Sequence, residues 1–492
     1  MKLLFKRVGF SKWAYVLVIF WILTVILGLT PWIYSDGAGD YAWVRSFFMD
    51  GNLDCSNEFA HYVKEFELKY GWEGPNDDLF PAKTETGYQA NKYPIGTAIL
   101  WSPFFLVGHM ATLLSNSLFQ SNIPTDGYSK WYVFFVSLGS NFYAFLGLFI
   151  AFYTAKRFFS ESSSFWATTG IWFASSIPVY MYLYPSMPHN TALFTVAFFY
   201  CYWLLTGIQR TKRQWTILGL AAGLMIITRM ESFVFLLLPF FEMAALFLKK
   251  TPIRAKIREY LASFFLFGAG IVSVFSVQML VWKAVFGSYF LNPYNEMTRI
   301  VSAAQIKYYG FLPHADVIPK PKSTIGSLLG FFLHPHIFDS LFGSSYGIYF
   351  WTPVLLLSTI GFIFLIRRSR RAGWSSFFAF LLIVYITSHA RKAGMSFGDR
   401  YLIKATIFYV LGLTAFFEFV KPKIRNFGLV AIVLLLVSWN GLLIVQYSTG
   451  LINRRGSVQW KKMVTNQFTT APKMLLQKLE PFLFGRSSAY KR

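Results

Sequence analysis

Runs of about 20 apolar residues recur along almost the whole chain of 492 residues, and no other feature limits its fold as strongly. A helical run of this length matches the roughly 30 Å hydrocarbon core of a bilayer. The composition agrees, because only 14% of the residues are charged, whereas soluble domains carry about 25%. The chain is therefore expected to be an all-α, polytopic membrane protein and not a soluble globular one.

We expect about 11–13 transmembrane helices. A further apolar segment, 95–114, contains Pro103. We expect it to form a hairpin or a half-helix, because a full crossing would move all later basic loops to the outer side. The first run follows a basic N-terminus and is too long for the core of a signal peptide, so it should remain as an anchor. Apart from the segment 95–114, and including the first run, the helices are expected at 13–33, 131–155, 164–178, 190–206, 215–229, 232–248, 259–283, 346–366, 374–388, 401–420 and 427–447.

The distribution of charge predicts how these helices are oriented. Six connecting segments hold 21 of the 46 basic residues and a single carboxylate, Glu161, so they should be cytoplasmic together with the N-terminus. The segment 34–94 holds 11 of the 22 acidic residues and should be extracytoplasmic. This rule also explains the net charge of +24, and no nucleic-acid partner is expected. The six basic segments are 1–12, 156–162, 208–214, 249–258, 367–373 and 421–426.

The resulting organisation is a transmembrane domain over residues 1–447, placed in the inner (cell) membrane, and a short basic tail over 448–492. The domain carries two large extracytoplasmic loops, at 34–94 and 284–345. Ionisable side chains lie at the outer edges of its apolar runs, where unpaired charges are costly and usually functional. These residues are Asp36, Asp40, Lys92, His189, Arg229, Glu231, Asp399 and Arg400.

Each of these residues also has a purely structural interpretation. Asp40 is placed to cap a short interfacial helix, and Arg229 and Glu231 are close enough in sequence to pair with each other. A single histidine such as His189 is often an ordinary buried polar residue, and Arg400 is placed to extend from a helix end toward the interface. The agreement of so many separate segments on one side of the membrane is what favours a functional site.

Together these groups are suited to one kind of chemistry. A carboxylate at the membrane boundary can accept a proton from an acceptor hydroxyl or amine. Arginine and lysine can hold the phosphate of a lipid-linked donor, arginine through two parallel hydrogen bonds. The sequence contains no phosphate-binding loop, no zinc-ligand spacing and no serine-hydrolase elbow. No cofactor is required by the pattern and no metal ligands are assigned, although the loop carboxylates are suited to a divalent cation.

Four short motifs occur in an order typical of a known superfamily. An acidic motif follows the first helix, with Asp36, Asp40 and Tyr41. Lys92-Tyr93-Pro94-Ile95-Gly96 precedes the next apolar segment, and a Gly-Leu-rich helix from Gly219 ends in Thr228-Arg229. Late in the chain stands Gly398-Asp399-Arg400-Tyr401. In this order the chain resembles the polytopic glycosyltransferases of the GT-C superfamily, in particular the protein O-mannosyltransferases and the bacterial lipid A aminoarabinose transferases.

The resemblance implies a GT-C-like fold and an enzyme that moves a sugar from a polyprenyl-phosphate donor to a lipid, glycan or protein acceptor on the extracytoplasmic side. It places Asp36 and Asp40 in catalysis, although the spacing Asp-Gly-Ala-Gly-Asp differs from the family's adjacent Asp-Glu. The other six site residues are then expected to bind substrate. Two alternatives stay open at this point, namely a transporter or flippase of lipid-linked saccharides, and a polysaccharide polymerase or ligase.

Overall fold

The computed structural model describes residues 11–70, 82–207, 209–248, 253–309, 335–389, 396–452 and 458–484. This part of the chain is helical, which confirms the expected all-α class. Extended segments pair there only in one isolated antiparallel bridge, between Lys83 and Gln89. Much of the second large loop, residues 310–334, lies outside the described residues.

Five helices of the described part are long and apolar enough to cross a membrane. Other expected crossings are shorter or composite. Helix α2 (Lys12–Gly28) has 17 residues, and the segment expected at 232–248 is the 3-10 helix η3 (Met230–Leu236) continued by α10 (Leu237–Leu248). The chain is thus a multi-pass membrane protein, and the number of crossings is left open. The five long helices are Gly96–Phe119, Lys130–Ala155, Leu261–Phe286, Arg370–Ser388 and Arg400–Ser448.

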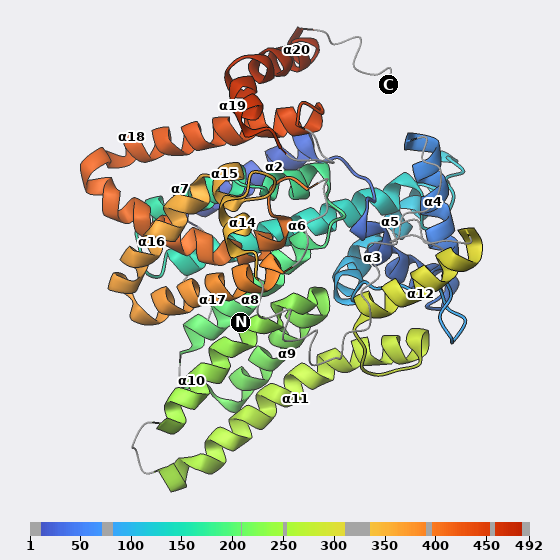
Figure 1. Cartoon of the computed structure of the whole chain (residues 1–492), viewed down its shortest axis with the longest axis horizontal. Helices are drawn as coiled ribbons and strands as arrows, with labels where there is room; N and C mark the ends of the chain where they lie inside the picture. Colours follow the sequence, from blue (N-terminus) through green and yellow to red (C-terminus); the bar gives the residue numbers. More distant parts are fainter. Residues whose placement is uncertain are drawn as a thin grey trace. The chain divides into compact units, whose positions relative to one another are not determined.

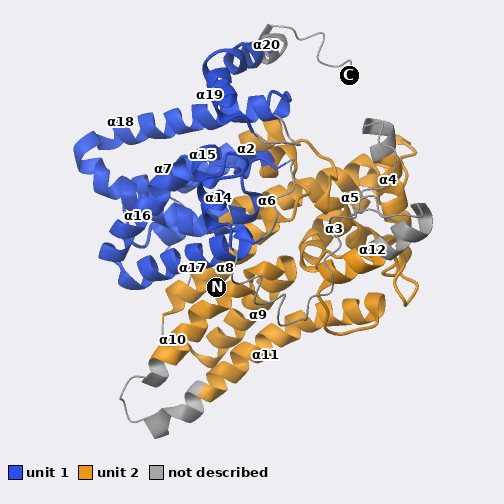
Figure 2. Ribbon diagram, in the orientation of Figure 1, with its two compact units in different colours: residues 1–21, 148–179, 334–492 blue, residues 22–147, 180–333 orange. Residues whose placement is uncertain are grey.

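The chain divides into two compact units, each built from separate stretches of sequence (Figure 2). Unit 1 contains residues 1–21, 148–179 and 334–492, and unit 2 contains residues 22–147 and 180–333. Of the residues singled out in the sequence, Asp399 and Arg400 belong to unit 1 and the other six to unit 2. Each unit is described by itself.

Unit 1 is a bundle of α7 (Glu161–Phe173), α16 (Val354–Arg368), α17 (Arg370–Ser388) and α18 (Thr406–Ser448) (Figure 1). Helices α16 and α18 approach closely at two glycines, since a Cβ on Gly361 would lie 1.8 Å from the carbonyl oxygen of Gly412. Small residues at such contacts are typical of membrane helices. Helix α18 bends at Arg425, where φ is 55°, between the two helices expected from the sequence.

Basic connecting segments meet at one end of unit 1. Arg368 donates a hydrogen bond from Nε to the carbonyl oxygen of Phe158 at 3.0 Å. The hydroxyl of Ser160 donates to the carboxylate of Glu418 at 2.6 Å, and the ammonium of Lys421 donates to the same hydroxyl at 3.2 Å. These contacts join the segments 156–162, 367–373 and 421–426, which were all expected on one side of the membrane. Which side this is stays a prediction.

In unit 2, the Gly-Leu-rich helix α9 (Lys212–Thr228) packs along α11 (Ile253–Phe286). A Cβ on Gly219 would lie 2.2 Å from the carbonyl oxygen of Phe267, and one on Gly223 would lie 2.8 Å from the side chain of Val274. The glycines of this motif therefore act through packing, because they let two membrane helices approach closely. Arg229 directly follows the C-terminal end of α9.

The apolar segment with Pro103 is one continuous helix, α5 (Gly96–Phe119), so the expected hairpin or half-helix is wrong. A proline costs only one backbone hydrogen bond, and an apolar helix packed on its neighbours tolerates that loss. Helix α5 runs beside α6 (Lys130–Ala155), with Gly108 against Tyr132. Whether α5 crosses the membrane stays open, but the chain on both sides of it contacts one short helix, α3 (Asp36–Arg45).

Candidate functional site

The two carboxylates of the acidic motif lie on helix α3, which Asp36 begins and on which Asp40 follows one turn later. Residues four apart share a helix face. Asp36 is 9% exposed and Asp40 only 1%. The glycines between them are required by close packing, since a Cβ on Gly37 would lie 2.3 Å from the carbonyl oxygen of Ser186 and one on Gly39 would lie 2.1 Å from the ring of Tyr93. The Asp-Gly-Ala-Gly-Asp spacing of the motif is thus explained by the close packing at Gly37 and Gly39.

The segment that contains Lys92 is held against α3 by polar contacts. The side-chain amide of Asn91 donates to the carbonyl oxygen of Gly39 at 2.9 Å, and the indole N–H of Trp43 donates to the carbonyl oxygen of Tyr93 at 2.9 Å. The hydroxyl of Tyr93 in turn donates to Oδ1 of Asp36 at 3.2 Å. One of the two acids is therefore oriented by a neighbouring phenol, a partner that the sequence motif alone did not identify.

Lys92 itself extends toward a second element of unit 2. Its ammonium lies 5.4 Å from the ring centroid of Tyr93 and 5.6 Å from that of Tyr294, at the start of α12 (Pro293–Tyr309). Aromatic faces attract cations at such distances. The second large loop therefore contributes a side chain next to the Lys-Tyr-Pro motif of the first.

The turn after Lys92 places the end of α9 beside α3. A Cβ on Gly96 would lie 2.5 Å from the backbone of Ile227 and Thr228, so only glycine fits there. The backbone N–H of Ile95 donates to Oε1 of Gln278 at 2.8 Å. Gln278 is fully buried, and an amide side chain inside a long, mostly apolar helix is the signal in the sequence by which it can be found.

Arg229 follows the last residue of α9 and is 4% exposed. Its Nε lies 3.1 Å from Oε1 of Glu231, which confirms the expected pairing of these two residues. The charge of Arg229 also acts on Asp40. The pairing therefore does not exclude a functional role, because the charge of the same guanidinium also lowers the pKa of Asp40 on the acidic helix.

The electrostatic environment separates the two carboxylates. Burial raises the pKa of Asp40 well above its ordinary value, Arg229 opposes this rise and Asp36 adds to it. Neither carboxylate oxygen of Asp40 has a hydrogen-bond partner among the described residues. Asp40 is thus a deeply buried acid beside a cation, whereas Asp36 is the more exposed member and has a phenol donor.

His189 begins α8 (His189–Thr206) and is 1% exposed. Its ring lies edge-on to that of Tyr180, with centroids 5.4 Å apart. The preceding segment packs on the start of α3, because the hydroxyl of Ser186 accepts a hydrogen bond from the backbone N–H of Tyr34 at 2.9 Å. His189 therefore stands three residues beyond a contact with the acidic motif.

Asp399 and Arg400 have local roles within unit 1. Asp399 caps the 3-10 helix η5 (Arg400–Ala405), since its carboxylate accepts from the backbone N–H of Tyr401 at 3.1 Å. Asp399 also lines a small cavity of unit 1 with Thr352 and Tyr409. The guanidinium of Arg400 lies 5.5 Å from the ring centroid of Tyr401. A contact of either residue with a substrate stays a prediction.

The described residues contain no group of three or more histidine, cysteine, aspartate or glutamate side chains arranged to hold a metal ion. The candidate site in unit 2 consists of the following groups: the carboxylates of Asp36 and Asp40, the guanidinium of Arg229 with its partner Glu231, the hydroxyl of Tyr93 and the ammonium of Lys92. Such a set can accept a proton at one carboxylate and bind an anion at the cations.

Comparison with known proteins identifies a related family. The family "Dolichyl-phosphate-mannose-protein mannosyltransferase" matches residues 127–241, a stretch that contains His189, Arg229 and Glu231. This match confirms the resemblance inferred from the motifs. The chain is a GT-C-type membrane glycosyltransferase. No curated protein matches the amino-acid sequence of this glycosyltransferase.

Two solved structures are similar to the glycosyltransferase over most of its length. One is ArnT from Cupriavidus metallidurans in the apo state, with 12% identity and a TM-score of 0.47, over 96% of this chain and 70% of that one. The other is the oligosaccharyltransferase of Archaeoglobus fulgidus, with 12% identity and a TM-score of 0.41, over 96% of this chain and 55% of that one. At these values neither structure assigns a role to a residue of this chain.

Proposed function

We propose that this glycosyltransferase moves a sugar from a polyprenyl-phosphate donor to an acceptor hydroxyl or amine on the extracytoplasmic side of the inner membrane. The observation that carries this proposal is the acidic pair on α3, together with the buried cation of Arg229, whose charge lowers the pKa of Asp40. A base and an anion-binding group side by side are what a displacement at a sugar phosphate requires. The donor class also agrees with the name of the matched family.

In the proposed reaction, Asp36 is the general base. It takes the proton from the acceptor while the acceptor oxygen or nitrogen attacks the anomeric carbon. The bond between that carbon and the phosphate oxygen breaks, and polyprenyl phosphate leaves with its negative charge held by Arg229 and Lys92. Attack opposite the leaving phosphate inverts the configuration at the anomeric carbon. Tyr93 orients the carboxylate of Asp36 through its hydrogen bond.

Asp40 has a supporting role in this scheme. It is too deeply buried to meet the acceptor, and the positive charge of the Arg229 guanidinium lowers its pKa. We assign to it the placement of that guanidinium. His189 and Glu231 line the same region and are proposed to contact substrate. A lipid, a glycan or a protein side chain each fits as the acceptor, since each offers a hydroxyl or an amine.

Transfer is expected to be seen directly with purified protein in nanodiscs. A panel of polyprenyl-phosphate-linked hexoses and pentoses is incubated with the protein, and mass spectrometry follows the release of free polyprenyl phosphate and the appearance of glycosylated product. Release of the carrier by the wild-type chain supports the proposal. Movement of intact donor between the leaflets of a liposome, without release of carrier, would instead identify a flippase.

The proposed side of the membrane is tested by labelling in intact cells. In a background where the two buried cysteines, Cys55 and Cys201, are replaced by alanine, single cysteines are introduced as Glu85→Cys and Lys212→Cys. Glu85 is in the first large loop and Lys212 begins α9, and both are exposed. A membrane-impermeant maleimide is expected to label only Glu85→Cys. Labelling of Lys212→Cys alone would contradict the proposed orientation and the side of the site.

A further inference from the structure

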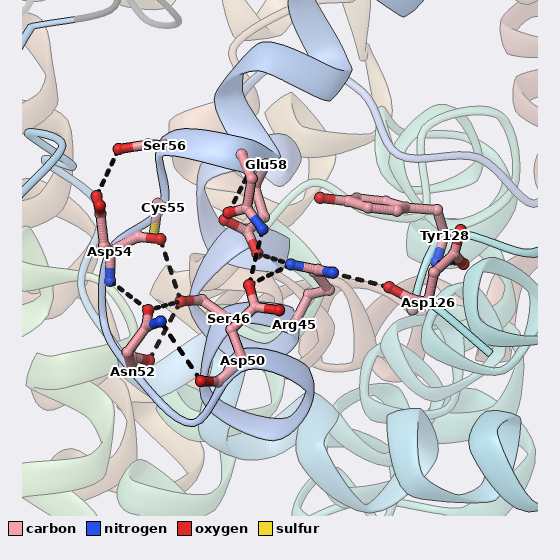
Figure 3. A network of polar contacts seen from close by, with 12 residues as sticks. Arg45, Ser46, Asp50, Asn52, Asp54, Cys55, Ser56, Glu58, Asp126 and Tyr128 are labelled. Carbon is pink, nitrogen blue, oxygen red and sulfur yellow. Dashed lines mark hydrogen bonds and ion pairs between the residues drawn. The ribbon is translucent and has the colours of Figure 1, made fainter.

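A buried arginine at the end of the acidic helix joins four parts of unit 2. Figure 3 shows Arg45, the last residue of α3, at the centre of a polar network. Its Nη1 donates to the carboxylates of Asp50 and Glu58, the latter at 2.7 Å, and its Nε donates to the carbonyl oxygen of Asp126 at 2.9 Å. Its guanidinium carbon lies 4.7 Å from the ring centroid of Tyr128.

These partners lie on three segments around the C-terminal end of α3. Asp50 ends the π-helix η1 (Ser46–Asp50), and Glu58 lies on α4 (Ser56–Tyr70). Asp126 and Tyr128 belong to the segment between α5 and α6. A single guanidinium thus fixes the C-terminal end of α3 to the π-helix, to α4 and to this later segment.

The segment between α5 and α6 is fitted closely to α3. Gly127 has φ +86°, and a Cβ there would lie 2.7 Å from Cγ of Arg45, so both the backbone conformation and the available space require glycine. The hydroxyl of Tyr41 donates to the carbonyl oxygen of the same glycine. Tyr41 is the residue next to Asp40, so the contact reaches the acidic pair directly.

The network is poorly suited to a purely stabilising role. Glu58 is fully buried, and burial raises its pKa to about 7 even though the bond to Arg45 lowers it. Because this pKa is above the value in the unfolded chain, ionising Glu58 costs folding free energy as the pH rises from about 4.5 to about 7. Buried ion pairs often add little stability compared with apolar packing and are better explained by geometric specificity.

We infer that Arg45 is a positioning residue for Asp40. It holds the end of α3 against three neighbours and thereby fixes Asp40, which lies five residues earlier and about 7.5 Å away along the helix axis. Catalytic groups must be held to within about 0.5 Å of their productive positions, and a displacement of about 1 Å lowers rates by roughly 100-fold. This inference rests on the proposed function of the α3 carboxylates.

The test is a double-mutant cycle with Arg45→Lys and Asp40→Asn. Lysine keeps the charge but cannot make the divergent bonds of a guanidinium to Glu58 and Asp126. In the wild-type background, Arg45→Lys is expected to lower kcat about 10–100-fold and to weaken donor binding, because Asp40 no longer places the guanidinium of Arg229. In the Asp40→Asn background the same change is expected to cost less than twofold, because the group it positions has already been lost.

The matched control is Arg299→Lys. Arg299 also pairs with carboxylates in unit 2, at Glu296 and Glu85, but its side chain is 59% exposed. This control is expected to keep kcat within twofold of wild type. Gly127→Ala provides a second variant that disturbs the same contact from the opposite side, and it should lower kcat and weaken donor binding in the same way. Thermal unfolding in detergent checks that each variant is folded.

The outcomes separate the inference from the proposed function. An equal loss for Arg45→Lys in both backgrounds would overturn the positioning role and leave the acidic site standing. Full turnover in Asp40→Asn would instead remove Asp40 from the proposed site. Wild-type kcat in Arg45→Lys, or failure of both Arg45→Lys and Gly127→Ala to fold, would assign this network to the fold alone and overturn the inference.

Discussion

Asp36→Asn is expected to abolish sugar transfer, with a loss of about 10²–10⁴-fold in kcat, the range typical for removal of a general base. Asparagine keeps the size of the side chain and still accepts the hydrogen bond from Tyr93, but it cannot take the proton of the acceptor. Because Asp36 is not placed to bind the donor phosphate, donor affinity and thermal stability should stay near wild type. The rate is measured as release of polyprenyl phosphate from a saturating donor.

A matched control for this substitution is Glu85→Gln, which also removes a carboxylate from the first large loop. Glu85 is 87% exposed and interacts only weakly with Arg299, so its loss should leave kcat unchanged. Asp40→Asn is expected to lower turnover less than Asp36→Asn, since its proposed role is indirect. Near-normal turnover in Asp36→Asn would show that the general base is another residue.

Arg229→Lys is expected to weaken donor binding about 10–100-fold, in line with roughly 1.5–3 kcal/mol for a hydrogen bond to a charged group. Lysine retains the positive charge that faces Asp40 but loses the planar pair of N–H donors suited to a phosphate. Equilibrium binding of a labelled donor to protein in nanodiscs measures the effect. Arg400→Lys in the same titration tests the phosphate contact predicted for that residue from the sequence.

Arg210→Lys provides a control for the loss of a buried arginine as such. Arg210 is 7% exposed and bonds to Glu242 at 2.7 Å, beside the opposite end of α9 from Arg229. Its replacement should lower the unfolding temperature but leave donor affinity unchanged. If Arg229→Lys binds donor as tightly as wild type, Arg229 does not contact the phosphate and its pairing with Glu231 is structural.

Several features of the site were accessible from the sequence because they depend on local spacing. Asp36 and Asp40 are four residues apart, so any helix through them presents both on one face. Arg229 and Glu231 were expected to pair and do so at 3.1 Å. Three basic segments lie together at one end of unit 1. The sequence predicts this, because basic loops that connect apolar helices are expected on the same side of the membrane.

Other features depend on segments far apart in the chain. The phenol of Tyr93 reaches Asp36 across 57 positions, and Arg45 reaches Asp126 across 81. No periodicity in a single sequence encodes such contacts, because they arise only when loops fold onto one another. The helix through Pro103 was misjudged because the expectation rested on the sidedness of the later basic loops, which does not determine whether one segment forms a continuous helix.

The sequence by itself determined that this chain is an all-α membrane protein, because the length of an apolar helix must match the thickness of a bilayer and both are local properties. It also determined which charged residues stand at the edges of those helices. Only the tertiary structure decided that both carboxylates are buried, Asp40 more completely than Asp36. Burial, and the pKa that follows from it, depends on what other parts of the chain place around a side chain.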